Sequence, residues 1–366
     1  MPETSGFDHR LHEAEARAAD FSKEPSLRLS RLGSGLINDT FLVESSKERW
    51  ILQRLNPEVF KDPTPVMRNF RRLQNHFDRH RSRREAPFQW PVLRTTRQGD
   101  DFLRDASGVL WRAMSHLNGG RLPRGLPDRA AAREVGCVLG WFHRDLAELD
   151  PLSLEDPLPG FHDTPAILAA FDAAHGARGQ NPMQSEVWWG TLERLRGRLG
   201  AVEDARRLGR IRLGIMHGDP KIDNVLFDEV SGRALGLIDL DTVRPGLWHQ
   251  DLGDCFRSLC QLSGRDDGAV VCDVALYEGL FEGYWAEARG LMAATDLDVL
   301  FEATWILPFE LGLRFATDHL QGDRYFKIGY PGHNLIRARK QFALVERILE
   351  QGPILRQTLQ RTFERA

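Results

Sequence analysis

The sequence has few cysteines, and their spacing suits neither a disulfide framework nor a zinc site. None of them belongs to a Cys-x-x-Cys pair, and no pair of histidines stands at a zinc-ligand spacing from them. We therefore expect buried free thiols in a reducing cytoplasm. The four residues are Cys137, Cys255, Cys260 and Cys272.

Long apolar runs and an excess of charge of one sign are also absent. No stretch approaches the roughly 20 apolar residues that span a bilayer, and the polar, acidic start MPETSGFDHRLHEAEAR has no signal-peptide pattern. The net charge of −3 argues against a general binder of nucleic acid or anionic membranes. With 42% hydrophobic residues over 366 positions, we expect a globular cytoplasmic protein, monomeric or homodimeric, without nucleic-acid or membrane partners.

Strand signals dominate residues 27–114. Short apolar or β-prone runs at 40–43, 50–52, 91–93 and 109–114 are separated by turn residues. A single helical pattern interrupts them, with apolar residues at helical spacing between Val66 and Phe77. These features predict a strand-rich N-terminal lobe over residues 1–114.

Helical signals dominate after Gly119-Gly120. The segment from Pro127 to Leu146 carries one apolar stripe, and the segments 163–175, 185–207, 268–290, 296–320 and 335–350 also indicate helices. Strand signal returns only at residues 211–239. The sequence thus predicts an α+β fold of two lobes, in which residues 115–366 form a larger helical lobe with a small strand insert.

That insert, residues 214–242, reads GIMHGDPKIDNVLFDEVSGRALGLIDLDT. Residues 225–227 and 234–238 predict an antiparallel hairpin with Ser231-Gly232 at its tip. Asn224 and Asp239 are equidistant from that tip, so we expect them to meet at the mouth of the hairpin. An amide oxygen and a carboxylate at one point are suitable ligands for Mg²⁺.

Asp219 and Lys221 lie in the loop that enters the same mouth. A carboxylate there can accept the proton of an attacking hydroxyl, while a metal and a cation stabilise charge on a transferring phosphoryl group. The spacing therefore predicts phosphoryl transfer. The alternative interpretation of each acid alone is a turn cap in a polar hairpin.

At this point the sequence resembles a known group of enzymes. HGDPKIDN is similar to the catalytic loop of protein kinases and of the aminoglycoside phosphotransferase/choline kinase superfamily, and IDLDT resembles its metal-binding segment. The resemblance implies a bilobal, protein-kinase-like fold that uses ATP and Mg²⁺. It makes Asp219 the base, Lys221 a γ-phosphate contact, and Asn224 and Asp239 metal ligands. Asp241 becomes either a further metal contact or a structural acceptor, and Asp251 a brace for the catalytic loop.

The sequence HRDL also resembles part of a kinase catalytic loop, but it lacks the rest of the motif. His143-Arg144-Asp145-Leu146 ends the helical segment and has neither an asparagine five residues later nor a metal segment behind it. We interpret it as a packed helix terminus.

The nucleotide is expected in the strand-rich lobe. Gly33, Ser34, Gly35 and Asn38 lie before the strand at 40–43, where a glycine loop brings backbone N–H groups close to phosphates. The lysine usual on the next strand of kinases is absent from WILQRLN. Arg54 matches the arginine of choline-kinase-like proteins, while Gln53 falls where a stricter alignment puts the lysine.

Two further positions bear on nucleotide binding. The helix after that strand has Arg68 where protein kinases offer a glutamate, which speaks against a protein kinase. The connector WRAMSHLNGG resembles a kinase hinge, so the backbone of Ser115, His116 and Leu117 is expected to hold adenine.

The acceptor is indicated by phrases scattered over residues 30–345. INDTFLV, WILQRLNPEVFKDP and RFATDHLQGDRYFKIGYPGHNLIRAR resemble the N-acetylhexosamine 1-kinase branch, which implies transfer to the anomeric hydroxyl of an amino sugar. Arg314 and Asp318 share a helix face and Tyr325 follows a turn, so the three form a candidate sugar site. His217 is expected to line that pocket or to bond within its own loop.

Several alternatives stay open from sequence. The acceptor of such a kinase could be an aminoglycoside, a choline-like compound or another small alcohol. The missing lysine and Arg68 also permit a non-catalytic nucleotide-binding protein. The structural alternative for Arg314 and Asp318 is an i,i+4 salt bridge beside an unrelated tyrosine.

Overall fold

The chain forms two units. The computed structural model describes residues 3–32, 37–80, 88–122, 125–177, 183–263 and 270–366. The first unit comprises Met1–Asn118 together with two short later segments, Leu154–Leu158 and Leu240–Val243. The second unit comprises Gly119–Ser153, Pro159–Asp239 and Arg244–Ala366. Leu240–Val243 therefore packs with the N-terminal residues.

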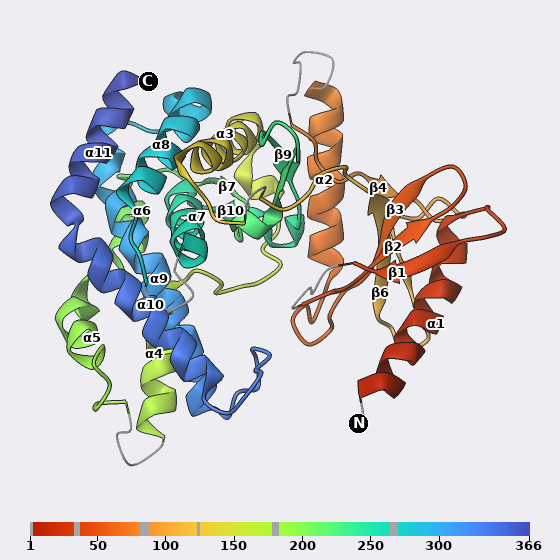
Figure 1. The fold of residues 1–366 in the computed structure, drawn as a ribbon, viewed down its shortest axis with the longest axis horizontal. Helices are drawn as coiled ribbons and strands as arrows, with labels where there is room; N and C mark the ends of the chain where they lie inside the picture. Colours follow the sequence, from red (N-terminus) through yellow and green to blue (C-terminus); the bar gives the residue numbers. More distant parts are fainter. Residues whose placement is uncertain (1–2, 33–36, 81–87, 123–124, 178–182, 264–269) are drawn as a thin grey trace. The chain divides into compact units, whose positions relative to one another are not determined.

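The first unit is built on an antiparallel sheet (Figure 1). Its strands follow the order β1-β2-β3-β6-β4, and β5 also pairs with β6. The register places Phe41 opposite Leu52 and Gln53 opposite Arg112. The strands are β1 (Arg28–Arg31), β2 (Asp39–Glu44), β3 (Arg49–Arg54), β4 (Leu93–Arg94), β5 (Leu103–Arg104) and β6 (Leu110–Ser115).

Helix α1 (Glu3–Phe21) covers one face of this sheet (Figure 1). Ala14, Ala18 and Phe21 pack on the side chains that alternate strand positions turn toward the helix. Those strand residues are Phe41, Val43, Trp50, Leu52, Trp111 and Ala113. The sequence did not predict α1, because two small alanines on its buried face give little hydrophobic signal.

Helix α2 (Thr64–His80) has the apolar spacing expected from Val66 to Phe77. The ring of Phe70 lies 5.3 Å from the guanidinium carbon of Arg112, so α2 faces the side of the sheet that carries Arg112 and Gln53. The buried amide of Asn69 donates to the carbonyls of Glu155 and Val243. This asparagine ties both late segments of the first unit to α2.

The second unit is mainly helical (Figure 1). The segment predicted at 185–207 consists of two short helices around a 3₁₀ turn, and a final helix follows the one expected to close the chain. The helices are α3 (Arg129–Leu146), α4 (Thr164–Gly176), α5 (Trp189–Leu195), α6 (Ala201–Arg207), α7 (Trp248–Ser263), α8 (Val274–Ala288), α9 (Leu297–Leu320), α10 (His333–Glu350) and α11 (Gly352–Arg365). Short 3₁₀ turns occur at Pro151–Ser153, Arg196–Arg198, Ile222–Asn224, Leu240–Thr242, Arg289–Leu291 and Ala294–Asp296.

Helices α3 and α8 touch at their backbones. A Cβ placed on Gly136 would collide with the carbonyl oxygen of Leu280, and one on Gly283 would collide with that of Arg133. Only glycine allows two helices to approach this closely. The contact fixes α3, whose last turn carries His143, against α8.

Two small antiparallel strand pairs complete the second unit. Strand β7 (Gly214–Met216) pairs with β10 (Arg244–Gly246), and β8 (Val225–Phe227) pairs with β9 (Ala234–Leu237). The predicted hairpin is thus present, with Gly232 at positive φ in its turn. A bulge at Leu226/Phe227 shifts the register.

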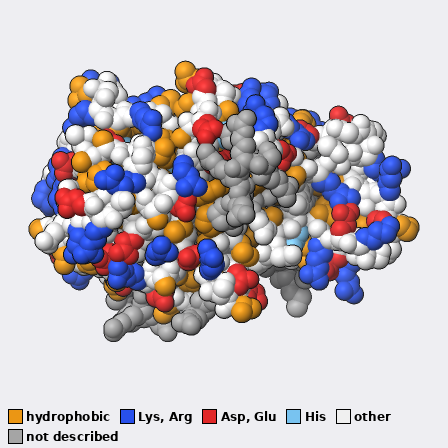
Figure 2. All heavy atoms as spheres, turned by 90° about the horizontal axis from the view of Figure 1, so that it is seen from above, with side chains coloured by type: hydrophobic (Ala, Val, Ile, Leu, Met, Phe, Trp, Pro, Cys, Tyr) orange, Lys and Arg blue, Asp and Glu red, His pale blue; other side chains and the backbone are white. Residues whose placement is uncertain are grey.

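The surface carries both signs of charge. On the face drawn in Figure 2, basic and acidic side chains are interspersed rather than gathered by sign, which accords with the net charge of −3. No helix in the described part of the chain is both long and apolar enough to cross a membrane.

Candidate active site

The loop between β7 and β8 brings Asp219, Lys221 and Asn224 together. The ammonium Nζ of Lys221 lies 2.5 Å from Oδ2 of Asp219. The amide Nδ2 of Asn224 donates to the backbone carbonyl of Asp219 at 2.8 Å and lies 3.3 Å from its Oδ2. With Nδ2 turned to Asp219, Oδ1 is the atom of Asn224 that remains to bind a cation.

Lys221 is a permanent positive charge in this loop. Burial alone would lower the pKa of Lys221, but the negative charges of Asp219 and Asp239 outweigh burial and raise it above its ordinary value. The lysine therefore stays protonated throughout the neutral range.

Asp239 occupies a strained backbone position. Its φ of +64° lies in the left-handed region that non-glycine residues rarely adopt. The bulge places Ile238 opposite Asn224, whose carbonyl accepts the backbone N–H of Ile238 at 2.9 Å. The prediction that Asn224 pairs with Asp239 was therefore wrong by one residue, although the two remain neighbours at the hairpin mouth. Strain of this kind is typical of functional positions.

His217 is fully buried and bonds within its own hairpin. Its Nε2 lies 3.1 Å from the carbonyl oxygen of Ile238, and its Nδ1 accepts the N–H of Asp219 at 3.4 Å. Burial lowers the pKa of His217, so the ring is neutral. Of its two expected roles, these contacts match the one within its own loop.

Asp251, the first acid of α7, holds the start of the loop that carries Asp219. Its carboxylate accepts the backbone N–H groups of His217 at 2.6 Å and Gly218 at 2.8 Å. His143 Nε2 lies 2.9 Å from the same carboxylate, and Tyr284 contacts the other ring nitrogen of His143. The HRDL string does end helix α3, as expected. Its histidine nevertheless supports the catalytic loop, a role that the sequence did not reveal.

Asp241 is a structural acceptor. One of its oxygens accepts from the buried guanidinium of Arg112 and the other from the amide of Asn38 at 2.8 Å. Both oxygens of Asp241 are therefore engaged by side chains of the first unit, which fits the structural-acceptor alternative considered from the sequence. Asn38 is likewise occupied, since its Oδ1 accepts the backbone N–H of Asn56.

Arg54 and Gln53 lie on opposite faces of strand β3. Arg54 shares the face covered by α1 with Trp50 and Leu52, and its Nη1 lies 3.6 Å from Asp39. Gln53 faces the α2 side and accepts from Arg112 at 2.7 Å. The structure thus places Arg54, the expected phosphate contact, on the α1 face near Asp39, whose shorter contacts are with Arg10 at 2.8–3.0 Å. Gln53 occupies the α2 face, where the stricter alignment places the lysine.

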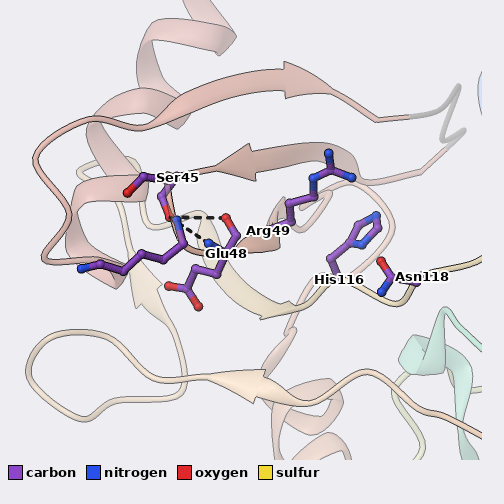
Figure 3. A pocket seen from close by; sticks show the side chains of 7 residues that line it. Ser45, Glu48, Arg49, His116 and Asn118 are labelled. Carbon is purple, nitrogen blue, oxygen red and sulfur yellow. Dashed lines mark hydrogen bonds between the residues drawn. The ribbon is translucent and has the colours of Figure 1, made fainter.

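Of the other residues expected to bind the nucleotide, the structure describes only some. Gly33, Ser34 and Gly35 lie outside the described residues. Ser115 pairs with Val92 through its backbone and its hydroxyl. A shallow surface hollow lies between the β2–β3 turn and the hinge segment (Figure 3). Its lining is polar, unlike the apolar slot that suits an adenine ring, and consists of Ser45, Ser46, Lys47, Glu48, Arg49, His116 and Asn118.

The residues expected to contact the acceptor lie in α9 and in the turn after it. Arg314 is surrounded by aromatic rings, with its guanidinium carbon 4.7 Å from the centre of Phe161, 5.6 Å from Phe326 and 5.8 Å from Tyr325. Tyr325 itself is 55% exposed. Arginine and tyrosine are therefore adjacent, as the sugar hypothesis requires.

The carboxylate of Asp318 is occupied by hydrogen bonds from the backbone. Its carboxylate accepts the N–H groups of Arg324, Tyr325 and Phe326 at 2.8–2.9 Å, and Asn334 donates to it at 2.9 Å. The residue is 3% exposed. The expected substrate contact by Asp318, and the alternative salt bridge to Arg314, are both replaced by this capping role.

No group of three or more His, Cys, Asp or Glu side chains within the described ranges is arranged to hold a metal ion. A magnesium ion needs fewer protein ligands, because it keeps several waters and binds substrate phosphates. Oxygen donors from Asn224 and Asp239 fit that requirement.

The fold and the loop define the class of the protein. A family model described as the phosphotransferase enzyme family matches residues 28–291. The chain belongs to this family, which includes the aminoglycoside phosphotransferases, and it has their kinase-like α+β fold. The fold expected from sequence is thereby confirmed.

Solved structures similar to this chain include three kinases of small molecules. A microcompartment-associated aminopropanol kinase is 15% identical, with a TM-score of 0.69 over 93% of this chain and 98% of its own. An aminoglycoside phosphotransferase from Alicyclobacillus acidocaldarius is also 15% identical, with a TM-score of 0.64 over 95% and 96%. An amicoumacin kinase, solved with AMP-PNP and Ca²⁺, is 13% identical, with a TM-score of 0.62 over 94% and 96%. At these identities the similarity establishes the fold.

Proposed function

We propose that the chain is an ATP-dependent kinase that transfers the γ-phosphoryl group to a hydroxyl of a small molecule. The arrangement of Asp219 between Lys221 and Asn224 supports this most directly. The carboxylate of Asp219 accepts the proton of the attacking hydroxyl, and Lys221 contacts the γ-phosphate. Asn224 and Asp239 would hold a magnesium ion, which would supply positive charge to the phosphate oxygens.

On the nucleotide side, Arg112 is a better candidate for the phosphate-facing cation than Arg54. Arg112 lies on the α2 face beside Gln53, where the usual lysine is missing. Its Nη1 is buried and makes no hydrogen bond in the structure. A buried guanidinium nitrogen in this state is ready to donate to an anion. Arg54 lies on the other face of the strand, with Nη1 3.6 Å from Asp39.

The proposed acceptor is the anomeric hydroxyl of an N-acetylhexosamine or a related neutral sugar. A guanidinium and a phenol can hydrogen-bond hydroxyl and amide oxygens, and Arg314 and Tyr325 lie close together. Asp318, the acid expected beside them, already accepts hydrogen bonds from three backbone N–H groups. A cationic acceptor such as an aminoglycoside would need a carboxylate there, so the surroundings of Arg314 favour a neutral one.

The test is Mg²⁺-dependent ADP release from ATP with a panel of acceptors. The panel contains N-acetylglucosamine, N-acetylgalactosamine, their parent hexoses, choline, aminopropanol and an aminoglycoside. We expect turnover on an N-acetylhexosamine, and we expect Asp219→Asn to abolish it while Mg–ATP still binds. The control is Asp223→Asn, which removes an exposed carboxylate from the same loop and should leave turnover intact.

Other results would redirect the proposal. Turnover confined to the cationic acceptors would reject the sugar assignment and retain the kinase. Full activity of Asp219→Asn would reject its role as the base. If the protein binds nucleotide but releases no ADP with any acceptor, the result would favour the non-catalytic alternative.

A further inference from the structure

The peptide group between Gly218 and Asp219 is held on its carbonyl side by a histidine from a distant part of the second unit. Nε2 of His162 lies 3.0 Å from the carbonyl oxygen of Gly218. The N–H of the same peptide group belongs to Asp219 and points to His217. Fixing this plane fixes the direction in which the backbone enters Asp219, because the peptide group is rigid.

Gly218 is therefore held at both ends. Its N–H donates to Asp251, and its carbonyl accepts from His162. Its φ of +86° is a conformation that a side chain would strain. Without both contacts, a glycine at this position would sample a wide range of conformations and carry Asp219 with it.

His162 is itself rigidly placed. Its Nδ1 lies 2.8 Å from Oε1 of Glu310 in α9, whose Oε2 accepts from the hydroxyl of Thr164 at 3.0 Å. The backbone carbonyl of His162 accepts from Gln250. His162 is 8% exposed and Glu310 is 1% exposed, so water competes little for these contacts.

The geometry requires a proton on each ring nitrogen of His162. A carbonyl oxygen and an ionised carboxylate are both acceptors, so a ring that bridges them with Glu310 ionised is an imidazolium. Burial opposes this charge, but Glu310 outweighs burial and raises the pKa of His162 above its ordinary value. Arg244 opposes the charge from one side and Asp254 favours it from another. The half-buried acid Glu203 interacts electrostatically with Glu310.

We infer that His162, held by Glu310, is a positioning residue that orients the Gly218–Asp219 peptide and thereby the carboxylate of Asp219. This inference rests on the proposed function, since it assigns Asp219 as the base. His162 does not contact the acceptor. Neither His162 nor Glu310 belongs to a motif of the sequence, because 148 positions separate them.

The experiment compares His162→Phe, which keeps a ring without a donor, with His162→Gln, whose amide can donate to the carbonyl of Gly218. We expect His162→Phe to lower kcat by about 100-fold, the cost of a small misplacement of a catalytic group, with KM for ATP changed less than threefold. We expect His162→Gln to recover at least tenfold of that loss. Leu300→Ala is the control, since it removes buried volume from α9, the helix of Glu310, away from the loop.

A second readout does not depend on turnover. Hydrogen exchange of the amide of Asp219 should accelerate in His162→Phe and stay at the wild-type rate in Leu300→Ala, even when the two variants are matched in Tm loss. Unchanged exchange, or a kcat loss no larger than that of Leu300→Ala, overturns the inference. If wild-type protein turns over no acceptor, the proposed function fails, while the exchange comparison still decides whether His162 holds the loop.

Discussion

Arg112 and Asp241 form a buried ion pair, with Nη2 of the guanidinium 2.5 Å from the carboxylate. Their side chains are 1% and 2% exposed. Arg112 also donates to Gln53 on the neighbouring strand. The pair connects strand β6 to Leu240–Val243, and through Gln53 the same arginine also holds strand β3, which lacks the usual lysine.

We expect Arg112→Met to lower the free energy of unfolding by about 3–5 kcal/mol, because it leaves the buried carboxylate of Asp241 unpaired. Adding Asp241→Leu should recover part of that loss, since both charges are then gone. Denaturant unfolding measures both variants. Lys61→Met, which removes an exposed partner of Glu58, is the control and should change little. A stability of Arg112→Met equal to wild type would contradict the pairing.

The half-buried acid Glu203, one oxygen of which is shielded from water, should make stability fall as pH rises. Burial raises the pKa of Glu203 to about 7 from a model-peptide value of 4.5. The folded state therefore binds more protons than the unfolded state between pH 4.5 and 7, and stability declines over that window by up to about 3 kcal/mol. We expect Glu203→Gln to flatten this decline and to be more stable than wild type at pH 8.

Thermal or urea unfolding at several pH values measures the difference. Glu229→Gln, at an exposed position, should follow the wild-type profile. An unaltered slope in Glu203→Gln would show that another group titrates.

The contact between α3 and α8 should tolerate no side chain. Gly283→Ala places a methyl group against the carbonyl of Arg133 and should cost at least about 1–3 kcal/mol of stability, as overpacking does. Gly190→Ala is the matched control, because nothing lies within 4 Å of its added Cβ. It should stabilise α5 by about 0.5–1 kcal/mol. Equal Tm values for the two variants would contradict the close approach.

Asp318→Ala should affect the acceptor more than the nucleotide. Three backbone N–H groups around Tyr325 lose their acceptor, at a cost of about 1–3 kcal/mol for each that stays buried and unpaired. We expect a raised KM for the acceptor, an unchanged KM for ATP and faster proteolysis within residues 321–332. Asp273→Ala removes a comparable cap from α8 and should leave both KM values unchanged. Equal increases in the two KM values would argue for a general loss of structure.

The sequence predicted the elements whose signals are local. The periodicity of α2 and α3 and the turn at Ser231-Gly232 depend on neighbouring residues, and all three were confirmed. The bulge at Leu226/Phe227 has no such signal, so the expected pairing of Asn224 was wrong by one residue. A one-residue shift of this kind depends on how the hairpin packs.

The roles of single acids were harder to predict, because their partners are distant in sequence. Asp241 is 129 positions from Arg112, and His143 is 108 positions from Asp251. Asp318 looked like a ligand-binding acid because it shares a helix face with Arg314. Its actual partners lie in the turn that follows α9, and no helical spacing points to them.

Asp318 and Asn334 also lie at the two ends of the segment that joins α9 to α10. The two side chains bond directly, at 2.9 Å, and between them runs the stretch that carries Tyr325. The stretch also rests on both helices, since Phe326 packs on Phe315 of α9 and Arg337 of α10 donates to the carbonyl of Lys327. Substitutions that keep these contacts would alter the surroundings of Tyr325, the proposed acceptor contact, and leave the loop around Asp219 unchanged.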